Sequence, residues 1–121
     1  MSGTDAAQFA IEIARVAADH RAEDVVAYDL RGISQVTDYT VIATGTSDRQ
    51  LRAVADRIIE FGRNIGERPY RSCGYEHATW IVLDFVDVIV HLFAKPYRAY
   101  YDLELLWGDA PALEWTRCES A

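Results

Sequence analysis

The chain has 121 residues, half of them hydrophobic, a composition typical of one folded domain rather than a disordered segment. Its 19 acidic residues against 12 lysines and arginines give a formal net charge of -7. This charge argues against extensive nucleic-acid contact, although a local arginine cluster is compatible with it, and it favours a basic protein as the partner.

The first half of the chain predicts one helix followed by two strands. Apolar residues recur at helical spacing from about Asp5 to His20, with polar residues on the opposite face. A valine-rich run then predicts a strand from Asp24 to Leu30. After a loop, a second strand is predicted from Tyr39 to Ala43.

The next helix has the clearest start signal in the sequence. Ser47 followed by Gln50 matches a capping box, in which a hydroxyl and an amide satisfy backbone donors of the first turn. Residues 45–47, Gly-Thr-Ser between a strand and a helix, could also bind an anion. They lack a Walker lysine and a GxGxxG run, so we interpret Ser47 chiefly as a cap.

The second half predicts a short strand near residues 70–73, a hairpin and a last helix. The dense apolar run Trp80–Phe93 is broken only at residues 84–87, which predicts two strands joined there. A helix is predicted from Tyr97 to Trp107 after a proline that a first turn tolerates. The order predicts an α/β domain with a mixed sheet of about five strands flanked by helices. We expect it to fill residues 1–110, with a flexible tail over 111–121.

The hairpin is unusual because apolar residues occupy its tip. Tips normally carry Gly, Asn or Asp, which tolerate positive φ and water, whereas this chain has Phe85 and Val86. We expect Phe85 to be exposed for a partner, as one of a set of aromatic residues typical of interface hot spots. Part of that set, including Trp107, is expected in the core. The set is Trp80, Phe85, Tyr97, Tyr100, Tyr101 and Trp107.

Patterns for catalysis and metal binding are weak. Asp84 and Asp87 flank the turn, but no third ligand converges, and acidic residues beside turns commonly bond backbone donors. His91 is more typical of a half-buried structural histidine than of a catalyst. Cys73 and His77 could pair, but no orienting residue or oxyanion hole accompanies them. We expect no enzymatic activity, no metal and no cofactor.

Cysteine usage and hydropathy favour a soluble cytoplasmic protein. Cys73 and Cys118 fit neither a metal spacing nor a disulfide framework, which favours a reducing compartment. The N-terminal residues do not have the pattern of a signal peptide, and no apolar run reaches the roughly 18–20 residues of a membrane helix.

Three blocks of sequence resemble the ribosomal silencing factor family, RsfS, also called the Iojap family. They are Asp38–Gln50, Trp80–Phe93 with its Asp-Val-Ile-Val-His core, and Arg98–Trp107. The blocks occur in order and at the family's spacing, and the resemblance runs from about residue 9 to residue 110. It implies a fold related to nucleotidyltransferases but without their catalytic carboxylates.

The resemblance implies a translation regulator. Members of the family bind the basic large-subunit ribosomal protein numbered fourteen and sterically block the small subunit when nutrients are short, with little direct nucleic-acid contact expected here. Isolated members are often homodimers. Carried over by motif, Trp80, Phe85 and Tyr101 would contact the ribosomal protein. The family usually has glycine where this chain has Val86, and a β-branched residue resists positive φ, so the turn type stays open.

Two other functions stay open from the residues alone. One is a nucleotide-binding or nucleotidyltransferase-like enzyme that uses residues 45–47 for phosphate and Asp84 with Asp87 for a metal. The other is a homodimeric interaction module that associates through the hairpin.

Overall fold

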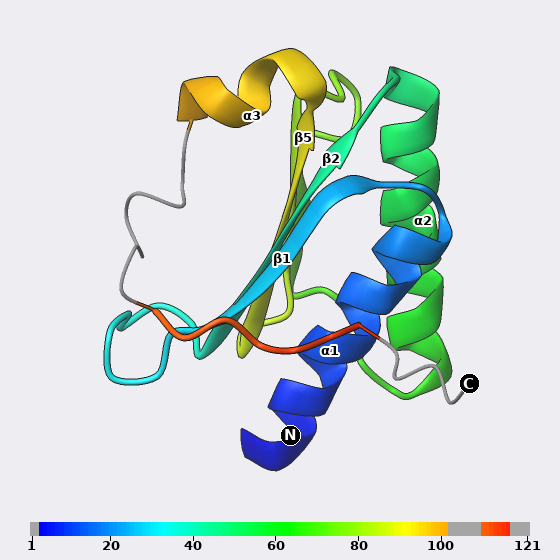
Figure 1. The fold of residues 1–121 in the computed structure, drawn as a ribbon. Helices are drawn as coiled ribbons and strands as arrows, with labels where there is room; N and C mark the ends of the chain where they lie inside the picture. Colours follow the sequence, from blue (N-terminus) through cyan, green and yellow to red (C-terminus); the bar gives the residue numbers. More distant parts are fainter. Residues whose placement is uncertain (1–2, 102–109, 117–121) are drawn as a thin grey trace, which may run out of the picture.

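The computed structural model describes residues 3–101 and 110–116, which form a two-layer α/β fold (Figure 1). The elements predicted from the sequence are all present and in the predicted order, although residues 102–107 of the predicted last helix lie outside the described residues. The elements are α1 (Gly3–Asp19), β1 (Glu23–Asp29), β2 (Tyr39–Gly45), α2 (Asp48–Asn64), β3 (Arg71–Cys73), β4 (Trp80–Asp84), β5 (Val88–Ala94) and α3 (Lys95–Tyr101).

The strands form one mixed sheet in the order β1-β2-β5-β4-β3. β2 and β5 run parallel, with Tyr39 opposite Val88 and Gly45 opposite Ala94, and every other neighbouring pair is antiparallel. All seven residues of β2 are buried, as expected for a strand in the middle of a sheet. The predicted fold class, a mixed sheet of about five strands flanked by helices, is confirmed.

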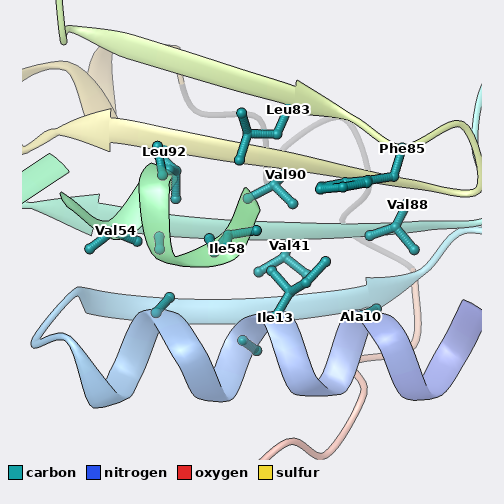
Figure 2. Packing of buried hydrophobic residues seen from close by; sticks show 14 of the residues in the cluster. Ala10, Ile13, Val41, Val54, Ile58, Leu83, Phe85, Val88, Val90 and Leu92 are labelled. Atoms are coloured by element: carbon teal, nitrogen blue, oxygen red, sulfur yellow. The ribbon is translucent and has the colours of Figure 1, made fainter. Parts of the chain in front are cut away.

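α1 and α2 lie on the same face of the sheet and enclose the main core with it (Figures 1 and 2). The apolar face of each helix meets the inward residues of the strands, and burial of each large aliphatic side chain contributes roughly 1.5–3 kcal/mol. This layer is therefore the principal source of stability. Its members include Ile13, Val41, Ile58, Leu83 and Val90.

The start of α2 carries the predicted cap. The Ser47 hydroxyl accepts a hydrogen bond from the backbone N–H of Gln50 at 3.1 Å. The Gln50 side-chain oxygen accepts from the backbone N–H of Thr46 at 2.6 Å, so the reciprocal half of the box is displaced by one residue. The Gln50 amide also donates to the carbonyls of His20 and Arg21, at 3.2 and 2.7 Å. One side chain thus helps to start α2 and ties it to the end of α1.

The prediction of a flexible tail is wrong for residues 111–116. The backbone N–H of Leu113 donates to the carbonyl of Ala27 at 2.7 Å, which adds this segment to the outer edge of β1. The Trp115 indole donates to the carbonyl of Val25 at 3.2 Å and packs against the core. The sequence signal for this docking is the pair Leu113 and Trp115, because alternate residues of an extended segment lie on the same face and can both pack against the core. Residues 117–121 lie outside the described residues.

A strained three-residue turn joins β4 to β5. The backbone N–H of Asp87 donates to the carbonyl of Phe85 at 3.0 Å, and φ of the central residue, Val86, is +76°. This is the rarer and more strained form of γ-turn. The Asp84 carboxylate stabilises the corner by accepting from the N–H of Val86 at 2.8 Å. The turn type that the sequence left open is therefore a γ-turn centred on Val86.

Replacing Val86 with glycine should raise the free energy of unfolding by about 1 kcal/mol. Relief of strain at positive φ, on the order of 1–3 kcal/mol, exceeds the extra chain entropy of glycine in the unfolded state, roughly 0.5–1 kcal/mol. Urea denaturation measures the change. Val36→Gly is the control, because Val36 is also exposed but does not have a positive φ. The free energy of unfolding of this variant should equal that of the wild type or be lower. Equal behaviour of the two variants would contradict the strain.

Candidate functional site: the aromatic corner of the sheet

Phe85 is a core residue and not an exposed tip, so the expectation of exposure is wrong. Only 5% of its surface is accessible. Its ring meets that of Phe9 edge to face with centroids 5.0 Å apart, and Phe9 in turn stacks on Phe61. A Cβ added at Gly62 would lie 3.3 Å from the Phe85 ring and 2.5 Å from the carbonyl oxygen of Glu67, so a glycine suits both neighbours. Figure 2 shows the ring between the sheet and α1.

The alternation of β4 explains this position. Ile81 and Leu83 point into the core, and Phe85 continues the same series two residues further on. The γ-turn then reverses the chain, so that Val86, 55% exposed, is the apolar residue at the tip. The period of two predicts a buried Phe85, whereas the composition of the turn predicts an exposed one, and the period is the stronger constraint.

Trp80 lies at the start of β4 on the sheet face that points away from α1 and α2. Its indole N–H donates to Nδ1 of His91 at 3.1 Å. The indole also stacks on the ring of Phe93, the residue opposite it on β5, with centroids 5.0 Å apart and planes 25° apart. Trp80 is partly exposed. Its ring is therefore held in one orientation while part of its surface remains accessible to a partner.

His91 supports Trp80 as an uncharged ring. Burial lowers the pKa of His91 to about 4. At neutral pH the ring is unprotonated at Nδ1, the atom that accepts from Trp80, so Nε2 carries the proton. This agrees with the half-buried structural histidine expected from the sequence.

α3 continues this surface beyond the end of β5. The backbone N–H of Ala94 donates to the carbonyl of Thr79 at 2.9 Å, which brings the start of α3 beside the start of β4. Arg98 fastens the helix to the sheet by donating to the Thr44 hydroxyl at 2.7 Å. Tyr97 of α3 is exposed. We name Trp80, His91, Phe93 and Tyr97 the aromatic corner.

The three contact residues implied by the resemblance do not form one patch in the described structure. Trp80 is on the outer face of β4, whereas Phe85 is on the inner face, just beyond the other end of the strand and about 16 Å away along it. Tyr101 is the last residue of α3, and its side chain lies outside the described side chains. The structure thus separates Phe85 from Trp80.

A clamp from α2 fixes the loop that leads into Trp80. Nε of Arg52 donates to the carbonyl of Tyr75 at 2.9 Å, a second N–H donates to the next carbonyl, and the guanidinium lies over the Tyr75 ring. The Tyr75 hydroxyl donates to Asp56 at 3.1 Å, and this bond raises the pKa of Tyr75 above its usual value. Gly74, with φ of +84°, lets the loop pass against the backbone of Trp80. Sequence patterns gave no sign of this clamp.

The geometry gives little support to the phosphate and metal alternatives. Ser47 and Gln50 already satisfy backbone donors at the start of α2, and the Asp84 carboxylate accepts from the turn. Within residues 3–101 and 110–116, no group of three or more His, Cys, Asp or Glu side chains could hold a metal ion, and Cys73 makes no hydrogen bond with His77. No helix in the described part of the chain is long and apolar enough to cross a membrane.

A family model described as "Ribosomal silencing factor during starvation" (RsfS) matches residues 4–121. The chain belongs to the RsfS family. Ribosomal silencing factors of Halalkalibacterium halodurans and Bacillus subtilis are 45% and 46% identical to it, over 79% and 77% of this chain and 82% and 79% of theirs. The chloroplastic protein Iojap of Arabidopsis thaliana is 34% identical over 88% of this chain and 44% of its own length.

Solved structures share the fold of this RsfS-family chain. A crystal structure from Bacillus halodurans is 38% identical, with a TM-score of 0.76, and the match covers 93% of this chain and 99% of that one. A crystal structure from Chromobacterium violaceum is 30% identical, with a TM-score of 0.79 and coverage of 89% and 88%. The resemblance seen in the three sequence blocks is confirmed, and the RsfS match extends beyond residue 110.

Replacing Phe85 with alanine should lower the free energy of unfolding by about 3 kcal/mol. The substitution removes the ring that packs on Phe9 and leaves a cavity beside Gly62. Urea denaturation measures the loss. Val86→Ala, at the exposed neighbour, is the matched control and should shift stability by less than about 1 kcal/mol. If the two variants were equally stable, the ring would be on the surface.

His91 should make the stability of the protein fall in mild acid. Its pKa of about 4 in the fold lies below the ordinary value of 6.5, so the unfolded chain binds the proton more readily. The stabilisation is complete above pH 6.5 and is lost as the pH falls toward 4, by on the order of 2–3 kcal/mol. Urea denaturation across this range should show a steeper loss for the wild type than for His91→Gln. Parallel profiles would argue against a buried neutral imidazole.

Proposed function

We propose that this RsfS-family protein binds the large ribosomal subunit and sterically blocks the small subunit, which represses translation when nutrients are limited. The observation that carries the proposal is the family match over residues 4–121, with curated relatives that bear the name ribosomal silencing factor. The partner we propose on the subunit is the basic ribosomal protein numbered fourteen. The protein would act by occupying space and not by catalysis.

The charge of the chain supports a basic partner. The net charge of -7 would attract a basic ribosomal protein over distances of about a Debye length and raise the association rate. Apolar contacts would then set the rate of release, because most affinity differences among related interfaces lie in dissociation. At high salt the association rate should therefore fall, while the specificity of binding, which depends on the apolar contacts, should be retained.

The aromatic corner and α3 are the contact surface that we propose, with Trp80 and Tyr101 as anchors. Trp80 is already held by His91 and Phe93, so binding would cost little side-chain entropy. Tryptophan and tyrosine are the residues most often found at hot spots. Phe85 would act indirectly, because its buried ring supports the hairpin.

This role would place the protein in the cytoplasm, where ribosomal subunits join. We also propose that the free protein is a homodimer, which is the state implied by the resemblance. A nucleotide-binding enzyme has less support, since the groups that it would use for phosphate and metal bond within the protein.

Replacing Trp80 with alanine should weaken binding to purified large subunits by about 30-fold, the effect of losing a hot-spot anchor worth roughly 2 kcal/mol. Co-sedimentation measures binding, and a subunit-joining assay should show that the variant no longer inhibits joining. Ile33→Ala removes an exposed apolar side chain from the loop after β1 and is the control. Thermal melts of both variants establish that they are folded. Wild-type affinity in a folded Trp80→Ala protein would exclude this contact surface.

A further inference from the structure

Positive charge gathers at one corner of this acidic protein. Between residues 62 and 72 the chain carries three arginines, Arg63, Arg68 and Arg71, and one acidic residue, Glu67. On the neighbouring strand, Asp84 lies opposite Arg71. Arg63 lies in the last turn of α2, Arg68 in the loop that follows and Arg71 at the start of β3. The backbone N–H of Tyr70 donates to the carbonyl of Asp84 at 2.7 Å. The cluster therefore lies beside the hairpin tip. We name Arg63, Arg68, Tyr70 and Arg71 the basic corner.

The three arginines of this corner are exposed, and the guanidinium of Arg71 lies over the ring of its neighbour Tyr70. Among the described residues, none of Arg63, Arg68 and Arg71 forms a salt bridge or a side-chain hydrogen bond. Arg63 is in the last turn of α2, where the helix dipole alone favours a cation. That explanation does not extend to Arg68 and Arg71, which lie outside the helix.

The corner also contains an open groove and an exposed aromatic ring. Arg63 and Arg68 line an open groove of about 530 Å³ together with Ile59 and Pro69. Tyr70 is 73% exposed, and the Arg71 guanidinium lies 5.8 Å from the centre of its ring. An exposed aromatic ring that does not pack against the core is available to stack on a ligand.

We propose that the basic corner binds the backbone of a single-stranded RNA segment, with the arginines on phosphates and Tyr70 stacked on a base. Free guanidinium groups beside an exposed aromatic ring are the combination that single-stranded RNA sites use. An acidic peptide would satisfy the charges but would leave the ring of Tyr70 without a role. The acidic remainder of the chain limits this contact to a few nucleotides.

The location links the corner to the proposed role on the ribosome, and in this respect the inference rests on the proposed function. Along β4, the end that carries the corner lies about 13 Å from Trp80, but Arg63 belongs to α2, which covers the opposite face of the sheet. A subunit surface that engages Trp80 and continues around the β3 edge of the sheet would bring ribosomal RNA to the corner. The protein contact would supply specificity and the RNA contact would add salt-dependent affinity.

The first test uses the free protein and does not depend on the ribosome. A short single-stranded oligouridylate is titrated into isotope-labelled wild-type protein at low ionic strength, and amide chemical shifts are followed. We expect the largest shifts at Arg63, Arg68, Tyr70 and Arg71, and their loss in the variant R63Q/R68Q. Polyglutamate is titrated in parallel. Equal or larger shifts with the peptide, or no shifts at the corner with RNA, would overturn the proposal.

The second test measures affinity for intact large subunits against salt. R63Q/R68Q should bind about tenfold more weakly than the wild type, and the slope of log affinity against log salt should fall by about 2. R21Q/R49Q is the control, because Arg21 and Arg49 are exposed at the other end of α2 and change the net charge equally. Its affinity should be that of the wild type.

Binding to the isolated ribosomal protein numbered fourteen separates the two proposals. R63Q/R68Q should bind it as the wild type does, because the corner contacts RNA and not this protein. An equal loss of affinity on the isolated protein, or no loss on the subunit, would refute an RNA contact. If the wild type bound neither, the proposed function would fail, and the oligouridylate titration would still decide the role of the corner.

Discussion

The pairing of β4 with β5 beneath two helices is the constraint on which the rest of this structure depends. Side chains of a strand alternate between the two faces of the sheet, and α1 and α2 cover only one face. Inward residues of β4 are therefore committed to the core, and outward residues are left for other uses. A shift of one residue in register would exchange Trp80 with Ile81 and lose both the core contact and the proposed contact surface.

Different local interactions fix the two ends of this hairpin. At the turn, the chain reverses within three residues through a strained γ-turn centred on Val86. The Asp84 carboxylate accepts a hydrogen bond from the backbone N–H of Val86, and Phe85 packs beneath the turn. At the other end, the Arg52 clamp guides the loop into β4. Backbone strain of the kind seen at Val86 persists where the surrounding packing over-determines it. Here the packing of Phe85 on Phe9 supplies that support at the turn.

The distribution of charge and aromatic surface gives the molecule two different ends. The aromatic corner joins the start of β4 to α3 on a chain that is acidic overall, whereas the unpaired arginines gather near the hairpin tip. The proposed partner, a ribosomal subunit, presents both basic protein and anionic RNA, so each of these two ends would meet a complementary surface.

Much of the fold was predictable from local patterns, because periodicity, capping and turn residues act over a few positions. The helix over residues 5–20, the Ser47 cap and the strand order along the chain follow from such signals. The docking of residues 111–116 was not predicted, because it depends on the free edge of β1, which is distant in sequence.

The candidate site divides in the same way. The sequence by itself determined the family, the acidic charge and the identity of Trp80 as a residue of interest. Only the tertiary structure decided that Phe85 is buried, that His91 is neutral beneath Trp80, and that the arginines of residues 63–71 lie beside the end of β4. The physical reason is that exposure, pKa and the neighbours of a charge are set by which surfaces meet, and those contacts join residues far apart in the chain.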